Sequence, residues 1–320
     1  MGVCGKITLL EVLMKKKYDI SPDFKMWANF HPPLNKPTIN FMQNLMGLSY
    51  LKEKSDANVI VEKLKIPFQG KDLRAIFYTP KTLQTPAPCL VYFHGGGFVL
   101  PAAPYHYNNC RKYATFANCK VLFVDYPLAP KNKHPVPMNA CFESYKWVIE
   151  NADAIGVDRS KVAVGGDSAG GAFSSVITLL AVDQNIQKPC GQMLIYPAVM
   201  MDKKTESMEK FTDTPLCNSK DCKKYEILYF ARPEDKNDKF VANMNDRDFA
   251  VFPPSYVETA EFDCLRDNGI LYAEKLKHAN VDTEINFTIG TIHGYDMVEN
   301  SPITQKSLEK RILFLKKIFK

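Results

Sequence analysis

Short apolar runs alternate with helical patterns along most of this 320-residue chain. Runs that predict strands, rich in β-branched and aromatic residues, lie at 59–66, 73–78, 89–93, 121–125, 161–165, 191–196, 255–260 and 284–289. Apolar residues at helical spacing lie between most of them, notably at 138–151, 169–182, 268–279 and 303–318. The alternation predicts an α/β fold with a mostly parallel sheet covered by helices on both faces. The first two runs are close together, which predicts an antiparallel hairpin at one edge.

Two regions interrupt this alternation, residues 1–50 and about 200–245. The first has a high density of large apolar and aromatic side chains, among them Phe24, Trp27 and Phe30. Such side chains also pack on a core in any amphipathic helix, so the composition alone leaves that alternative open. We expect the two regions to form a helical cap over a domain built from residues 51–320.

The stretch KVAVGGDSAGG, residues 161–171, places a serine where a β-branched run ends and a helical pattern begins. In a nucleophile elbow the serine occupies a strained strand-to-helix turn, so the residues two before and two after it must be small. Gly166 and Gly170 meet this requirement on either side of Ser168. The helix N-terminus directs free N–H groups toward the serine, and the N–H of Ala169 is one of them. The pattern predicts Ser168 as a nucleophile.

Three consecutive glycines, Gly95, Gly96 and Gly97, follow His94 at the end of another predicted strand. Residues without a Cβ let an anion approach backbone N–H groups closely. A flexible turn is the simpler interpretation of such a loop taken alone. Together with the elbow, however, an HGGG sequence at this position predicts the N–H donors of an oxyanion hole.

A serine nucleophile needs a base, and only two histidines follow the elbow in the chain. His278 ends a helical pattern beside Lys277, which indicates a solvated surface. His293 follows the strand-like run 284–289 through a loop, where it can reach the edge of the sheet. The order nucleophile, acid, base along the chain therefore favours His293 as the base.

The orienting acid is expected at the end of the preceding strand, where Asp263 stands. Asp267 lies at the start of the next helical pattern and is interpreted as that helix's N-terminal cap. Glu261 is a neighbour in the same strand. Both Asp267 and Glu261 remain alternatives for the acid.

Five sequence blocks together resemble those of the hormone-sensitive lipase family of α/β-hydrolases. They are HGGGF at 94–98, YPLAP at 126–130, GDSAGG at 166–171, EFDCLRD at 261–267 and HGY at 293–295. The resemblance extends from about residue 60 to the C-terminus. It implies an α/β-hydrolase fold in which residues 1–50 are the N-terminal part of the cap. Residues 51–320 would be the catalytic domain, with a cap insertion at about 200–245.

The resemblance also implies a role for each motif residue. Ser168 would be the nucleophile, His293 the base and Asp263 the orienting acid of a catalytic triad. The implied oxyanion donors are Gly96, Gly97 and Ala169, with Gly95 as an alternative to one of the two glycines. The sequence departs from the family pattern at Lys131, where Glu is usual, and at Cys264, where Pro is usual. Neither departure falls on a residue that performs the chemistry.

These assignments predict a serine carboxylesterase that hydrolyses esters with short to medium acyl chains through an acyl-enzyme. An amidase or deacetylase with the same machinery is one alternative, and a non-catalytic ligand-binding receptor on the same scaffold is another. The resemblance implies a small-molecule ester as substrate, and we expect the chemistry to require no metal or cofactor. Ser-His-Asp hydrolysis needs only the groups named above.

Composition argues against several other classes of protein. The formal charge of +6 comes from dispersed lysines, which indicates a solvated basic face rather than a nucleic-acid site. No apolar run approaches the ~18 residues that a membrane-spanning helix needs. The nine cysteines are odd in number and scattered, unlike a disulfide framework or a paired CxxC zinc site, so we expect a reduced, cytoplasmic protein. The sequence leaves formation of a homodimer open.

Overall fold

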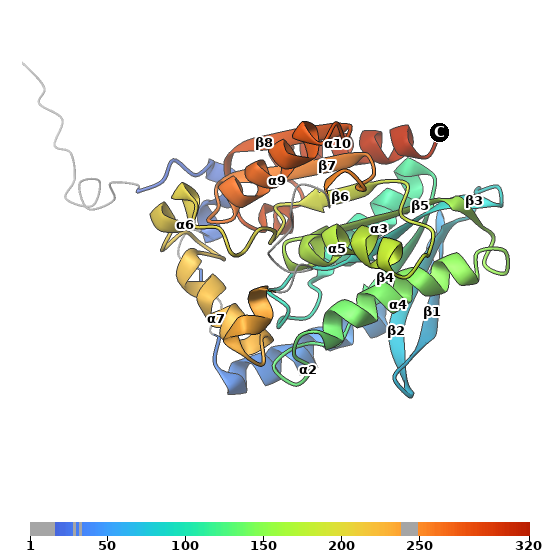
Figure 1. The fold of residues 1–320 in the computed structure, drawn as a ribbon, viewed down its shortest axis with the longest axis horizontal. Coiled ribbons are helices and arrows are strands. Elements are labelled where there is room, and N and C mark those ends of the chain that lie inside the picture. Colours follow the sequence, from blue (N-terminus) through green and yellow to red (C-terminus); the bar gives the residue numbers. More distant parts are fainter. Residues whose placement is uncertain (1–16, 28–29, 32–33, 238–248) are drawn as a thin grey trace, which may run out of the picture.

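The computed structural model of the chain describes residues 17–27, 30–31, 34–237 and 249–320. Parts of the two expected cap regions, at 1–16, 28–29, 32–33 and 238–245, lie outside the described residues. Figure 1 shows a central sheet with helices packed on it. None of the helices in the described ranges combines the length and the apolarity needed to cross a membrane.

The central sheet has eight strands in the order β1-β2-β4-β3-β5-β6-β7-β8. The strands are β1 Val59–Phe68, β2 Lys71–Pro80, β3 Ala87–Phe93, β4 Lys120–Asp125, β5 Val157–Asp167, β6 Gln192–Ile195, β7 Ser255–Phe262 and β8 Thr283–Ile292. The β1–β2 and β2–β4 pairs are antiparallel, and the remaining pairs are parallel. All eight predicted runs are confirmed as strands, and so is the antiparallel hairpin at one edge.

The described helices connect the strands and flank the sheet. They are η1 Pro22–Trp27, α2 Lys36–Lys52, α3 Pro104–Ala117, α4 Val136–Glu150, α5 Ala169–Asp183, α6 Glu206–Lys210, α7 Ser219–Tyr229, η2 Pro233–Asn237, α9 Arg266–His278, η3 Tyr295–Met297 and α10 Pro302–Ile318. The four helical patterns singled out in the sequence are confirmed as α4, α5, α9 and α10.

Side chains that alternate along the strands build a separate apolar core on each face of the sheet. On β3, Val91 and Phe93 pack in one core with residues of α4 and α5. Leu90 and Tyr92 face the opposite core, which includes residues of α3 and α10. Since successive strand residues point to opposite faces, a central strand buried on both sides reads as a continuous apolar run. The predicted covering of both faces is thereby confirmed.

The parallel strands carry four loops to the same edge of the sheet. The glycine loop follows β3, and Ser168 follows β5 directly. Asp263 comes immediately after β7, and His293 immediately after β8. Because parallel strands end at the same edge, residues distant in sequence meet there.

Segments outside the sheet lie next to this edge. In Figure 1, α6 and α7 lie together beside the sheet, near the N-terminal segment. The amide of Gln43 in α2 donates hydrogen bonds to the carbonyls of Val99 (2.8 Å) and Ala129 (2.9 Å). The backbone N–H of Leu216, in the segment before α7, donates to the carbonyl of Phe30 (2.8 Å). These contacts join α2 to the loops after β3 and β4, and they join the segment before α7 to the N-terminal segment.

Candidate active site

Ser168 occupies a sharp turn between β5 and α5, as its sequence context predicts. Its φ of 52° is uncommon for a residue with a side chain. The turn is held by a hydrogen bond from the Ser168 N–H to the carbonyl of Ile195 (2.8 Å). A Cβ on Gly170 would collide with the carbonyl oxygen of Phe93, so only glycine fits two residues after the serine. The local sequence thus permits a turn that places the serine at the end of the strand, where it lines a cavity.

Three of the predicted site residues form a continuous hydrogen-bonded line. Ser168 Oγ lies 2.8 Å from His293 Nε2, and His293 Nδ1 lies 2.7 Å from Asp263 Oδ2. The other carboxylate oxygen of Asp263 accepts a hydrogen bond from the N–H of Leu265 (2.9 Å). Since the carboxylate only accepts, Nδ1 carries the proton, and Nε2 is left to accept the serine proton. This arrangement has the geometry of a base poised beside a hydroxyl nucleophile.

The surroundings of His293 favour its protonated form despite burial. Burial is the largest influence and opposes a positive charge on the imidazole. The charge of Asp263 and its hydrogen bond act in the opposite direction, and the net effect raises the pKa of His293 above 6.5. The ring of Tyr196 packs edge-on against the imidazole, with centroids 5.0 Å apart. The histidine is therefore held in place and stabilised as an imidazolium when it takes a proton.

In the glycine loop, one backbone N–H group donates a hydrogen bond, whereas two others have no acceptor among the described residues. The N–H of Gly95 donates to Asp167 Oδ1 at 3.0 Å, so the structure removes Gly95 from the expected oxyanion donors. The N–H groups of Gly96 and Gly97 have no acceptor among the described residues. Gly96 has a φ of 121°, a conformation that essentially only glycine adopts. Gly96, Gly97 and Ala169, the first residue of α5, remain as candidate donors near Ser168.

Asp167 is a site residue that sequence reasoning missed. It lies inside the GDSAGG block, and its buried carboxylate accepts hydrogen bonds from the hydroxyl of Tyr92 (2.8 Å) and from His106 Nε2 (3.0 Å) as well as from Gly95. Burial opposes its ionisation, but His106 and these hydrogen bonds lower the pKa of Asp167 to about 2. The carboxylate ties the glycine loop to the elbow. The acid within the block was the available signal, but its partner at Gly95 is visible only in the fold.

His94 stabilises the backbone of the glycine loop. Its Nδ1 donates to the carbonyl of Gly95 (2.6 Å), and the hydroxyl of Tyr126 donates to the carbonyl of His94 (2.7 Å). The His94 and Tyr126 rings stack with centroids 4.4 Å apart. Burial lowers the pKa of His94 to about 3, so the ring is neutral. His94 thus acts on the backbone of the loop.

The alternative acids and base lie elsewhere. Glu261 accepts a hydrogen bond from the N–H of Gly290 (2.7 Å), and His278 is exposed at the end of α9. The interpretation of Asp267 as the cap of α9 is wrong, because the helix begins at Arg266 and its N-cap residue is Leu265. The Asp267 carboxylate instead accepts the N–H of Ser207 in α6 (2.7 Å). None of these groups contacts His293.

A cavity of about 280 Å³ opens onto the serine. Its floor contains the elbow, the glycine loop and His293. Its walls come from segments outside the sheet, namely Trp27, Phe30, Met42, Leu216, Cys217 and Tyr225. The lining is mainly apolar, with a few polar groups gathered around Ser168, as is usual for a small-molecule site.

A buried charge network, also missed in the sequence, supports the loop that carries His293. Arg311 of α10 is fully buried and pairs with Glu258 of β7 and with Asp296 of η3. The guanidinium lies 2.8 Å from Asp296 Oδ1, and Asp296 Oδ2 accepts from the hydroxyl of Tyr196 (2.6 Å). Tyr196 is the residue whose ring packs on His293. The network therefore connects the last helix to the base.

Comparison with known proteins gives a consistent result. A family model described as the alpha/beta hydrolase fold matches residues 90–297. The chain is 34% identical over 221 residues to esterase LipI of Mycobacterium tuberculosis, which covers 68% of this chain and 69% of that protein. It is 33% identical over 240 residues to carboxylesterase NlhH of the same organism, covering 73% of this chain and 75% of the relative.

Solved structures give the same picture. A structure titled bacterial heroin esterase superposes with a TM-score of 0.84 at 27% identity, over 94% of this chain and 98% of that one. The hyperthermophilic esterase of the archaeon Pyrobaculum calidifontis superposes with a TM-score of 0.83 at 31% identity, over 93% of this chain and 98% of the other. Both similarities extend well beyond the segment matched by the family model.

Proposed function

This chain belongs to the hormone-sensitive-lipase-like carboxylesterases of the alpha/beta hydrolase fold, and from that premise we propose that Ser168, His293 and Asp263 are its nucleophile, base and orienting acid. The protein is an enzyme of the carboxylic ester hydrolase class, which replaces the alternative of a non-catalytic receptor. The observation that carries the residue assignment is the hydrogen-bonded line from Ser168 Oγ through the imidazole to Asp263.

In the proposed reaction, Ser168 Oγ attacks the ester carbonyl while His293 Nε2 takes the hydroxyl proton. The Asp263 carboxylate holds the imidazole in the tautomer that accepts this proton and stabilises the resulting imidazolium. The tetrahedral intermediate collapses when the bond to the alcohol breaks and His293 returns the proton to the leaving oxygen. Water, activated by the same imidazole, then attacks the acyl-serine and releases the acid.

The developing negative charge on the carbonyl oxygen needs hydrogen-bond donors that are already in place. We assign this role to the N–H groups of Gly96, Gly97 and Ala169. The first two lack acceptors among the described residues, and the third opens α5, where the helix dipole favours an anion. Preorganised donors of this kind each contribute about 10²–10³ in kcat in comparable sites.

The size of the cavity supports a preference for short to medium acyl chains. Its volume of about 280 Å³ lies just below the roughly 300–1,000 Å³ that is usual for small-molecule pockets. Trp27 and Tyr225 are among the large side chains that line the cavity. We propose that the N-terminal segment and the region from about 200 to 245 act as the cap that sets this volume.

The setting in which the enzyme works is proposed from its cysteines. The eight cysteines among the described residues are free thiols, and seven of them are buried. A chain of this kind fits a reducing compartment such as the cytoplasm.

A substrate panel tests the proposed function. We expect p-nitrophenyl acetate, butyrate and octanoate to be hydrolysed with higher kcat/KM than the matching p-nitroanilides and than emulsified trioleoylglycerol. Ser168→Ala should abolish turnover, whereas Ser175→Ala, in the helix α5 that follows Ser168, should retain it. Higher kcat/KM on the anilides would indicate an amidase, and higher kcat/KM on the emulsion would contradict the assigned chain length.

A further inference from the structure

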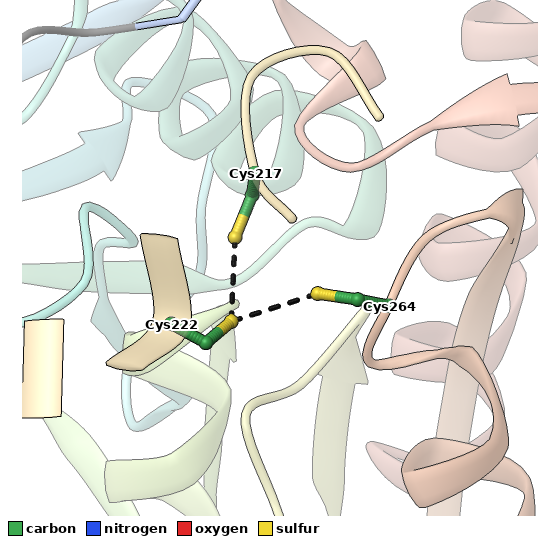
Figure 2. A group of neighbouring side chains, drawn as sticks. All are labelled: Cys217, Cys222 and Cys264. Atoms are coloured by element: carbon green, nitrogen blue, oxygen red, sulfur yellow. Dashed lines mark hydrogen bonds between the residues drawn. The ribbon is translucent and has the colours of Figure 1, made fainter. Parts of the chain in front are cut away.

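Three cysteines from separate segments converge next to the triad. Cys217 precedes α7, Cys222 lies within α7 and Cys264 directly follows Asp263. Figure 2 shows their sulfur atoms pointing toward one another, with dashed lines that join Cys222 to each of the other two. The Sγ atoms of Cys217 and Cys222 are 3.7 Å apart, and those of Cys222 and Cys264 are 3.5 Å apart. All three sulfurs lie within 4.8 Å of one another.

These separations match those of thiolates around a single metal ion. With zinc–sulfur bonds of about 2.3 Å and tetrahedral angles, two ligating sulfurs stand about 3.8 Å apart. A disulfide would require a separation of about 2.0 Å, well below either observed distance. Three sulfurs within 4.8 Å of one another are close enough to bind one ion that has three protein ligands.

The burial of the cluster favours a metal ion whose charge nearly balances the charges of the three thiolates. The three side chains are buried with apolar neighbours that include Phe211 and Leu265. Three thiolates around a divalent ion leave one net negative charge, whereas a monovalent ion would leave two, and burying charge is costly. A divalent ion that favours sulfur ligands is therefore the better match.

The cluster adjoins the substrate cavity. Cys217 is one of the residues that line this cavity, so the cluster borders the cavity through this residue. A water on that side can complete a tetrahedral ion that has three protein ligands. The cluster contains neither the nucleophile nor the base.

We propose that Cys217, Cys222 and Cys264 form a binding site for one divalent thiophilic ion of the zinc class. Binding displaces the three thiol protons as three metal–sulfur bonds form. The ion links α7 and the segment before it to the loop that carries Asp263. Occupation of the site therefore stabilises the folded chain, whatever substrate the enzyme hydrolyses.

Cobalt is a suitable probe because thiolate-to-cobalt charge transfer gives an absorption band that zinc lacks. The full-length protein, reduced and freed of metal by a chelator, is titrated with Co²⁺ and then with Zn²⁺. We expect the band to saturate at one ion per chain, zinc to abolish it by displacement, and Zn²⁺ to raise the melting temperature.

Matched variants localise the site. Cys222→Ala should remove the band and weaken binding by at least about 100-fold, since loss of an outer partner alone costs 10–100-fold. Cys141→Ala deletes a buried thiol in α4, outside the cluster, and should bind Co²⁺ as the wild type does. Circular dichroism checks that Cys222→Ala is folded. If this variant does not fold, the number of Co²⁺ ions bound per wild-type chain decides the test. Absence of a one-to-one band in the wild type, or its persistence in Cys222→Ala, would overturn the proposal.

Discussion

Two carboxylates four residues apart, Asp263 and Asp267, have entirely different partners. Asp263 contacts His293 at 2.7 Å, whereas Asp267 contacts the N–H of Ser207 in α6 and pairs with Arg266. If Asp263 orients the base, Asp263→Asn should leave the fold and KM nearly unchanged and lower kcat by orders of magnitude. The equivalent change in a serine protease costs about 10⁴ in kcat.

Asp267→Asn is the matched control for that substitution. It preserves an oxygen that can accept the N–H of Ser207 and loses only a partly exposed ion pair, so kcat should stay near the wild-type value. Measurement of kcat and melting temperature for both variants separates the two roles. A large loss of kcat in Asp267→Asn with little change in Asp263→Asn would show that the acid is assigned to the wrong residue.

The pH dependence of activity follows from the environment of His293. Burial disfavours the imidazolium, but Asp263 outweighs this and raises the pKa of His293 above its ordinary value of about 6.5. Only the neutral imidazole accepts the serine proton, so kcat/KM should fall as the pH drops through this raised pKa. A kcat/KM profile from pH 5 to 9 on a soluble butyrate ester measures the midpoint. A profile that stays flat to well below pH 6.5 would contradict a histidine base.

At this scale the sequence revealed the residues that stand in recognisable motifs. Ser168 could be predicted because it stands where a strand-like run ends and a helical pattern begins. His293 could be predicted because it stands in a loop that follows the nucleophile and the acid in chain order. The hydrogen bond from the Gly95 N–H to Asp167 could not be predicted, because it joins the loop after β3 to the last residue of β5 and exists only once the sheet is assembled. For the same reason, sequence alone could not choose among the glycines of the loop.

At the scale of elements, one buried arginine joins α10 to β7 and η3. Arg311 is fully buried between Glu258 and Asp296, and the desolvation of all three groups is offset only while they remain paired. Arg311→Met should therefore destabilise the fold by about 3–5 kcal/mol, because it leaves two buried carboxylates without a counter-charge. Urea unfolding at neutral pH measures the loss.

Lys317 is the control for Arg311 on the same helix. Its ion pairs with Asp282 and Glu284 are about half exposed, so Lys317→Met should change the free energy of unfolding by no more than about 1 kcal/mol. Equal losses from the two substitutions would show that burial of the network contributes nothing special to stability.

Among the described helices, α3 flanks the sheet but was not singled out in the sequence. Its sequence, PYHYNNCRKYATFA, has few strong helix formers, and its buried face includes the polar residues His106 and Asn109. Hydrophobic periodicity does not detect a face of this kind. The predicted strands, in contrast, were short runs of β-branched and aromatic residues with clear ends. Their pairing order depends on contacts between distant segments, which periodicity does not contain.

At the scale of the whole molecule, the catalytic geometry depends on a sheet edge and on the segments that cover it. The sheet edge was predictable, because parallel strands bring their carboxyl ends together. The cover was predictable only as two stretches that interrupt the alternation. Which of their residues face the cavity, such as Trp27, Met42 and Tyr225, follows from packing between segments far apart in the chain.

The central claim is that Ser168 is the nucleophile of this esterase, and covalent labelling tests it most directly. A fluorophosphonate reacts with an activated serine, so the protein should gain one phosphonate adduct, which peptide mass spectrometry should locate at Ser168. Ser168→Ala should gain none under the same conditions. Labelling of another serine, with the adduct unaffected in Ser168→Ala, would contradict the account.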